Sequence, residues 1–260
     1  MAQPPSQSGI DAEFWDVPAI RDVVKILFDV EYRSDSSYQL LLRFCGMSFK
    51  RPDPFDKHRD EQAITRRMAE VKAQVKDLLD AGWEVYAADE VRLEHEAETR
   101  RMWLPRGQRT KLSVDRQKTS QSFFGALSLT SKKVKLYPVE GNQNTEQTIL
   151  ALDRLQRETR EEKIAVVLDN ARFHHAKMLT GLYEPGQLLE RITPIHLPPY
   201  APDHNPVEHV WNTAKNNIAN IQRETPEETF GAFASHITGR TFDHDFEHLP
   251  PRETENDLVS

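Results

Sequence analysis

The chain has 260 residues, a formal net charge of −7 and a hydrophobic content of 38%. This length allows one large domain, alone or with a small additional one. Apolar runs reach only about five residues, whereas a membrane-spanning helix needs about 20. The N-terminus has no secretion-signal pattern, and the single cysteine, Cys45, leaves no partner for an intramolecular disulfide. We therefore expect a cytoplasmic protein without a membrane contact.

The first part of the chain is predicted to be helical. Residues 1–15, rich in Pro, Ser and Gln, are expected to be disordered. Amphipathic helices are predicted at 18–28 and 35–44, followed by a proline-containing linker at 51–54 and a long amphipathic helix at 61–81. The first two helices fit either a helix-turn-helix or an ordinary helical hairpin. The pattern alone favours the hairpin, because Arg43 is the only cation of the second helix.

The remainder is predicted to contain strands first and then alternating helices and strands. The expected strands are 85–88, 123–129, 134–139, 164–168 and 192–197, and the expected helices are 145–157 and 205–221. This order indicates an α/β protein with a mixed sheet and helices packed on it. The segment beyond Arg240 is acidic, contains proline and is expected to be loosely structured.

Three acidic residues stand at the ends of these elements. Asp89 and Asp169 follow apolar strands, and Glu208 lies in the first turn of a helix. Carboxylates at strand ends face the crevice where α/β sheets bind ligands. Three together would hold divalent cations, Mg²⁺ or Mn²⁺, because like charges share a site only around a cation. Each also has a structural alternative: a polar strand end, a turn, and a helix capping box.

Positive charge is concentrated in one segment. Residues 100–135 contain ten Lys or Arg and a single acid, Asp115, giving +9 and leaving −16 for the rest of the chain. This segment is predicted to bind a polyanion, and a solvated basic hairpin is the alternative. Arginines there would contact phosphate and Trp103 would stack on a base, or Trp103 would pack in a hairpin core. The expected DNA contacts are Arg101, Trp103, Arg106, Arg109 and Lys111.

Several motifs resemble those of DDE transposases of the mariner superfamily, in its bacterial insertion-sequence branch. Residues 169–174 read DNARFH, and residues 197–211 read LPPYAPDHNPVEHVW, similar to the family's LPPYSPxLNPIExxW signature. Asp89–Glu90 matches the DE at the first catalytic acid. Residues 101–107 resemble the WxPRG hairpin, residues 124–127 resemble the GAL strand, and Lys215 stands where the family usually has a lysine.

The resemblance implies an RNase H-like fold with Asp89, Asp169 and Glu208 as a catalytic triad that binds Mg²⁺ or Mn²⁺, with two ions expected. It implies DNA strand cleavage and strand transfer of an insertion sequence. The partners would be terminal inverted repeats and target DNA in the nucleoid, bound by a homodimer. Arg172, His174 and Lys215 are further expected DNA contacts, although packing of His174 near the strand end is an equal alternative. The expected domains are a partial helix-turn-helix or winged-helix region at 16–55, a catalytic domain at 60–225, and a C-terminal helix with an acidic tail at 226–260.

Two features depart from the family pattern. Asp169 and Glu208 are separated by 38 residues, slightly more than is usual, with the extra length expected near 181–187. A loop insertion there costs little. The family usually has two N-terminal helix-turn-helix units, and this chain has room for about one. The alternative function is therefore an N-terminally truncated, catalytically inactive DNA-binding remnant. An RNase H-like repair or RNA-cleaving nuclease is a further alternative.

Overall fold

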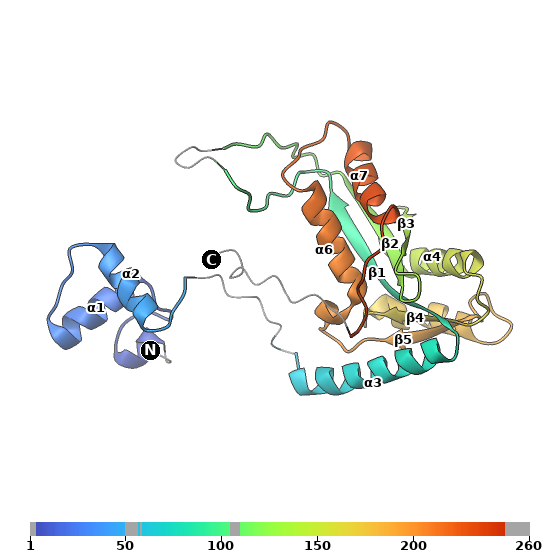
Figure 1. Cartoon of the computed structure of the whole chain (residues 1–260), viewed down its shortest axis with the longest axis horizontal. Coiled ribbons are helices and arrows are strands. Elements are labelled where there is room, and N and C mark those ends of the chain that lie inside the picture. The colour runs from blue at the N-terminus through green and yellow to red at the C-terminus, as the bar shows by residue number, and fades with distance from the viewer. Residues whose placement is uncertain (1–3, 50–56, 58, 105–109, 248–260) are drawn as a thin grey trace. The chain divides into compact units, whose positions relative to one another are not determined.

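The computed structural model describes residues 4–49, 57, 59–104 and 110–247, without the side chains of Ser8, Arg172 and Phe173 (Figure 1). The predicted linker at 51–54 and the last part of the acidic tail lie outside the described residues. The chain divides into two compact units, the first with the described residues up to 49 and the second with those from 57 onward. In the described part of the chain, no helix is long and apolar enough to cross a membrane.

The first unit is a small helical one. It contains a 3-10 helix at Pro5–Ser8, α1 (Val17–Phe28) and α2 (Asp35–Phe44), packed around Ile20, Val24 and Tyr38. Asp16 caps α1 by accepting a hydrogen bond from the Ala19 N–H at 2.8 Å. The sequence predicts disorder for residues 1–15, whereas the structure has the 3-10 helix and a buried Ile10 there.

The second unit begins with α3 (Glu61–Asp80) and contains a five-stranded sheet with further helices (Figure 1). The strands are β1 (Glu84–Glu94), β2 (Ser120–Ser128), β3 (Val134–Val139), β4 (Ile164–Leu168) and β5 (Ile192–His196). The helices are α4 (Thr145–Glu158), α5 (Lys177–Thr180), α6 (Pro206–Ile218) and α7 (Pro226–Thr238), with 3-10 helices at Arg172–His175, Gly181–Tyr183 and Pro202–His204.

The sheet order is β3-β2-β1-β4-β5. The β1–β2 and β2–β3 pairs are antiparallel, and the β1–β4 and β4–β5 pairs are parallel. The sheet is therefore mixed and flanked by helices, which confirms the predicted fold class. The two strands that carry the expected catalytic aspartates, β1 and β4, are direct neighbours in its centre.

Alternation along the strands divides the side chains between two helix layers, because successive residues of a strand point to opposite faces. On β1, Val85 and Ala87 pack with α3, whereas Tyr86 and Ala88 pack with α4. Further along β1, Val91 and Leu93 pack with α6 and α7. The odd-numbered face of β1 is thus covered by α3, α6 and α7, and the even-numbered face by α4.

The structure corrects one boundary that matters for the site. The sequence predicts a strand at 85–88 that ends before Asp89, but β1 continues to Glu94. The parallel pairing with β4 ends at Ala87–Val167, while the antiparallel pairing with β2 continues to Glu94–Ser120. Asp89 therefore lies within a strand, just beyond the point where the neighbouring strand β4 stops.

Candidate active site

The two aspartates emerge from adjacent strands of the sheet. Ala87 of β1 pairs with Val167 of β4, and Asp89 and Asp169 each follow two residues later. Residues two apart in a strand point to the same side, so Asp89 continues the face of Val85 and Ala87, toward the layer of α3, α6 and α7. Asp169 directly follows the end of β4, and its charge acts on the Asp89 carboxyl group.

Glu208 reaches this position because the start of α6 is fixed to β1. Asn205 caps α6 by accepting a hydrogen bond from the Val207 N–H at 3.4 Å. Its amide nitrogen donates to the carbonyl oxygen of Ala88 at 3.1 Å, and Asn205 is fully buried. One side chain thus begins the helix and holds it against the residue before Asp89. Glu208, in the first turn, then shares a hydrogen bond with the Asp89 carboxyl group.

Trp211 completes the contact between α6 and Asp89. It follows Glu208 by three residues, so both side chains lie on one face of the helix. Its buried indole N–H donates to Asp89 Oδ2 at 3.2 Å. The ring lies directly over Gly125, the residue paired with Asp89 on β2, and a Cβ there would come within 2.1 Å of the ring. Gly125 is therefore required for Trp211 to reach Asp89.

The segment that leads into α6 is held by an ion pair that the sequence analysis did not identify. The guanidinium of Arg59 donates to the two carboxylate oxygens of Asp203 at 2.7 and 3.2 Å and to the Tyr200 carbonyl at 2.8 Å. The Arg59 side chain is only 10% exposed. These contacts fix the PPYAPDHNP turn, in which Tyr200 has a left-handed φ of 59°.

The carboxyl groups of Asp89 and Glu208 are electrostatically unfavourable neighbours. Burial raises the pKa of Asp89 well above its usual value, and the charges of Glu208, Glu90 and Asp169 raise it further. Burial also raises the pKa of Glu208, although the hydrogen bond with Asp89 and the charge of Lys215 act in the opposite direction. Two acids whose pKa values both rise share protons unless a cation replaces them.

Asp169 has a different environment, because a buried histidine compensates its charge. His174 Nδ1 lies 2.8 Å from Asp169 Oδ1, and Nε2 lies 3.5 Å from Glu90 Oε1. Burial lowers the pKa of His174, but these hydrogen bonds outweigh it and raise the pKa to about 10. Burial likewise acts to raise the pKa of Asp169, but the bonds from His174 and the Ala171 N–H lower it overall. At neutral pH the pair is therefore an imidazolium and a carboxylate.

Alternation on β1 explains how His174 contacts Glu90. Glu90 points to the opposite face from Asp89, toward α4, where it also accepts a hydrogen bond from the Thr148 hydroxyl at 3.2 Å. His174 was expected to contact DNA. The structure instead supports the packed alternative, because its ring is fully buried and both ring nitrogens face carboxylates.

The three carboxylates suit a hard divalent cation by donor type, because Mg²⁺ and Mn²⁺ prefer oxygen ligands. Burial raises the pKa of both Asp89 and Glu208, and neighbouring acids add to this effect, so a bound cation would favour their ionised forms. Among the described residues, no group of three or more His, Cys, Asp or Glu side chains has the spacing of a metal site as it stands. Asp89 and Glu208 bond to each other and Asp169 bonds to His174, so cation binding would replace the first of these bonds.

The residues that were expected to contact DNA differ in how exposed they are. Trp103 is 96% exposed, which excludes the alternative of packing in a hairpin core. Arg101 and Lys111 are also exposed, and Lys215 is half-buried near the last turn of α6. Arg106 and Arg109 lie outside the described residues, as does the side chain of Arg172.

Sequence reasoning identified the three acids but not the residues that hold them. Asn205 was identifiable as a helix cap, but its bond to β1 was not. The spacing of Glu208 and Trp211 was a usable signal, because residues three apart share a helix face. Nothing in the local sequence indicates that Trp211 contacts Asp89 or that Gly125 provides the space for its ring.

Three carboxyl groups thus come from a central strand, from the residue directly after the neighbouring strand and from the first turn of a docked helix. Residues 84–229 match the family described as DDE superfamily endonuclease. This match covers more than half of the chain, so the chain belongs to the DDE superfamily of endonucleases. Residues 11–71 match the winged helix-turn-helix family, which identifies α1 and α2 as part of such a motif rather than an ordinary hairpin.

The fold is similar to solved structures of the Mos1 transposase. The paired-end complex with the left transposon end has a TM-score of 0.57 at 14% identity, covering 87% of this chain and 72% of that chain. The Mos1 strand transfer complex gives 0.57 at 14% identity, with 88% and 72% covered. A Mos1 paired-end complex with Mn gives 0.57 at 15% identity, with 87% and 72% covered. This likeness confirms the RNase H-like fold. No curated protein matches the chain.

Proposed function

We propose that this protein is a transposase of the bacterial insertion-sequence branch, which cleaves DNA strands and transfers the ends of its element into a target. The convergence of Asp89, Asp169 and Glu208 from β1, the end of β4 and the start of α6 carries this proposal. The similar Mos1 structures include a paired-end complex and a strand transfer complex, which supports the same reaction class.

In the proposed site the three carboxylates bind two Mg²⁺ or Mn²⁺ ions. When bound, such ions activate an attacking hydroxyl and stabilise the leaving oxygen of a phosphodiester. The protein's own groups prepare the ligands. His174 keeps Asp169 ionised and fixes its direction, and Trp211 fixes one oxygen of Asp89. Asn205 holds Glu208 beside them. In the proposed reaction, water would attack a phosphodiester bond and release the 3′-hydroxyl of the element end. That hydroxyl would then attack a phosphodiester of the target strand, from which the target's own 3′-hydroxyl leaves.

DNA binding is assigned to two parts of the chain. We propose residues 16–55 as the region that recognises terminal inverted repeats, residues 60–225 as the catalytic domain, and residues 226–260 as a C-terminal helix and tail. In the catalytic domain, Arg101, Lys111 and Lys215 would contact phosphates and the exposed Trp103 would stack on a base. Arg106, Arg109 and Arg172 complete the proposed set. Two copies acting on two element ends would form a homodimer.

The decisive experiment is strand cleavage by an Asp169→Asn variant in the presence of Mg²⁺. Metal ions contribute several kcal/mol of transition-state stabilisation, so loss of a ligand should slow cleavage about a thousandfold or more. Asp77→Asn is a matched control, because Asp77 is an exposed residue of α3 on the same unit. Circular dichroism checks that both variants fold. A folded Asp169→Asn variant that cuts DNA as fast as the control would refute the proposed function.

A further inference from the structure

The segment between β1 and β2 leaves the sheet as two arms that carry the exposed Trp103 and its basic neighbours (Figure 1). We call residues 95–104 the outgoing arm and residues 110–119 the returning arm. The pairing of β1 with β2 ends at Glu94–Ser120, followed by one more backbone bond from the His95 N–H to the Thr119 carbonyl at 2.8 Å. Beyond that point, something other than sheet pairing must hold the arms.

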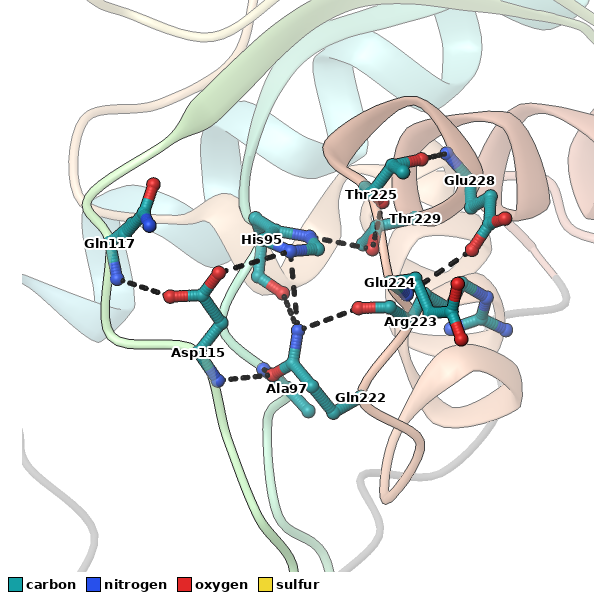
Figure 2. A network of polar contacts seen from close by, with 10 residues as sticks. All are labelled: His95, Ala97, Asp115, Gln117, Gln222, Arg223, Glu224, Thr225, Glu228 and Thr229. Atoms are coloured by element: carbon teal, nitrogen blue, oxygen red, sulfur yellow. Dashed lines mark hydrogen bonds and ion pairs between the residues drawn. The ribbon is translucent and has the colours of Figure 1, made fainter.

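The side-chain amide of Gln222 connects the two arms at this point (Figure 2). Its oxygen accepts hydrogen bonds from the backbone N–H of Ala97 on the outgoing arm and of Asp115 on the returning arm, each at 3.0 Å. Its nitrogen donates to the carbonyl oxygens of His95 at 3.3 Å and Arg223 at 3.1 Å. One side chain therefore satisfies backbone groups that would otherwise pair across two strands.

The imidazole ring of His95 takes part in the same network of hydrogen bonds. Its ring is almost fully buried, with Nδ1 2.9 Å from the Thr229 hydroxyl oxygen on α7. Nε2 lies 3.3 Å from the Gln222 nitrogen and 3.8 Å from Asp115 Oδ2. Because the Thr229 hydroxyl donates to the Thr225 carbonyl, it accepts from Nδ1–H of His95. Figure 2 shows His95, Asp115 and Gln222 facing one another at the base of the arms.

A second amide residue continues this attachment along the outgoing arm. The Asn220 N–H donates to the Glu98 carbonyl at 2.9 Å, and its side-chain oxygen accepts from the Arg100 N–H at 2.8 Å. Asn220 has a left-handed φ of 61°, which asparagine tolerates better than most residues. The Arg100 guanidinium also donates to Asn216 in α6. The outgoing arm is thus attached up to the residue directly before Arg101.

These contacts connect the arm to the helix that carries the catalytic glutamate. Glu208 lies in the first turn of α6, whereas Asn216 lies near its end and Asn220 and Gln222 follow directly. The rise of an α-helix places the end of α6 about 15 Å from Glu208, the length of about four stacked base pairs. The distance between the arm and the carboxylates is therefore set by a rigid helix.

From this connection we propose that Gln222 and Asn220 are positioning residues that fix the arm relative to the catalytic carboxylates and so determine which phosphodiester bond is cut. This inference rests on the proposed function. It assigns no chemical step to either residue, because both act through the backbone of the arm. Their loss should reduce the accuracy of cleavage more than its rate.

The structural half of the test is amide hydrogen exchange on the full chain. Gln222→Met preserves side-chain length but removes the amide, so exchange at Ala97 and Asp115 should accelerate by at least about tenfold, since each loses a hydrogen bond. Gln222→Glu restores an acceptor oxygen and should return exchange toward that of the natural protein. Asn220→Gly keeps the left-handed backbone and should accelerate exchange at Arg100 alone. Asn217→Ala, an exposed amide on α6, is the control.

The functional half maps cleavage positions at single-nucleotide resolution on an end-labelled duplex carrying one element end. The natural protein and Asn217→Ala should cut at one predominant position, whereas Gln222→Met should spread its cuts over neighbouring bonds with less than about tenfold loss in rate at saturating DNA. Gln222→Glu should restore part of the accuracy, which a merely destabilised fold would not do.

The two hypotheses fail in different ways. If the natural protein does not cut DNA, the proposed function fails. If it cuts, and Gln222→Met shows faster exchange in both arms yet cuts at the same single position, the positioning inference alone is wrong. Unchanged exchange at Ala97 and Asp115 in Gln222→Met would equally overturn it.

Discussion

Two clusters of side chains around carboxylates in the second unit differ in how their negative charge is neutralised. Glu158, at the end of α4, accepts hydrogen bonds from Arg154 Nε at 2.9 Å and the Tyr137 hydroxyl at 2.8 Å, with Lys135 Nζ at 3.9 Å. Burial acts to raise the pKa of Glu158, but these partners lower it overall. At Asp89 and Glu208, burial and neighbouring acids raise both pKa values.

The difference shows at which cluster the protein neutralises the carboxylate charge with its own side chains. At Glu158 the protein supplies its own cation, so the cluster contributes to the fold and needs nothing further. At Asp89 the partners are the Trp211 indole, the Glu90 backbone N–H and another carboxyl group, and Lys215 only partly offsets the negative charge near Glu208. Asn205, Trp211 and Gly125 nevertheless hold these acids together, which is unfavourable unless an external cation binds.

The largest stability effect is expected on removing the residue that keeps the two acids together. Asn205→Ala loses a helix cap and leaves the buried Ala88 carbonyl without its partner, at a combined cost of about 2–4 kcal/mol. It should also lower cleavage, because Glu208 is no longer held beside Asp89. Denaturant unfolding and strand cleavage measure the two effects.

Asn144→Ala is the matched control for Asn205. Asn144 caps α4 through the Gln147 N–H at 2.9 Å but is exposed, and its side chain has no hydrogen bond to β1 among the described residues. It should cost about 1 kcal/mol and leave cleavage unchanged. Equal loss of cleavage in both variants would contradict the role assigned to Asn205.

Added Mg²⁺ should supply the positive charge that the cluster around Asp89 and Glu208 lacks, and so stabilise the folded protein. An ion that binds only the folded state at 100 times its dissociation constant stabilises it by about 2.7 kcal/mol. The natural protein should show this gain in the midpoint of denaturant unfolding, whereas Glu208→Gln should show a much smaller one. Glu158→Gln should gain as much as the natural protein. A gain that is the same in all three would show that Mg²⁺ binds elsewhere.

Gly125→Ala tests the contact between Trp211 and Asp89. The new methyl group would overlap the indole ring, which must move, and overpacking of this kind costs about 1–3 kcal/mol. Movement of the ring also removes its hydrogen bond to Asp89, so cleavage should fall by more than the loss of folded protein explains. Trp211→Phe separates the effects, because it removes the N–H but retains most of the ring. Full activity in Trp211→Phe would show that the hydrogen bond has no role.

The smallest effect is expected at Glu158, and it depends on pH. Because its pKa is lowered in the folded state, Glu158 contributes stability that is present above the usual carboxyl pKa of about 4.3 and is lost as pH falls through the lowered value. The side chain is 41% exposed, so solvent screening limits the contribution to less than about 1 kcal/mol. Glu158→Gln should therefore be less stable than the natural protein at pH 7, and the difference should disappear as the pH falls below the lowered pKa of Glu158. A difference that does not shrink with falling pH would have another cause.

Local patterns were enough to predict most elements and the three acids. The apolar periodicities located α3, β4 and α6, and the motifs around Asp89, Asp169 and Glu208 identified the acids. Local patterns could not give the length of β1, because its second half is defined by pairing with β2, which begins only at Ser120. They also left the role of His174 open between a DNA contact and local packing, because its burial depends on Glu90, which is 84 residues away in the chain.

Two consecutive acids on β1 make the geometry of the proposed site depend on how β1 is aligned with β2. Asp89 faces α6 and Glu90 reaches His174 on the opposite side, so the two neighbours are not interchangeable. A slip of β1 by one residue against β2 would exchange their directions. The slip would also move Gly125 out from under Trp211, where any side chain would collide with the ring. Steric overlap therefore disfavours a misaligned sheet even without bound metal or DNA. Gly125 thus favours the correct alignment of β1 and β2 during folding.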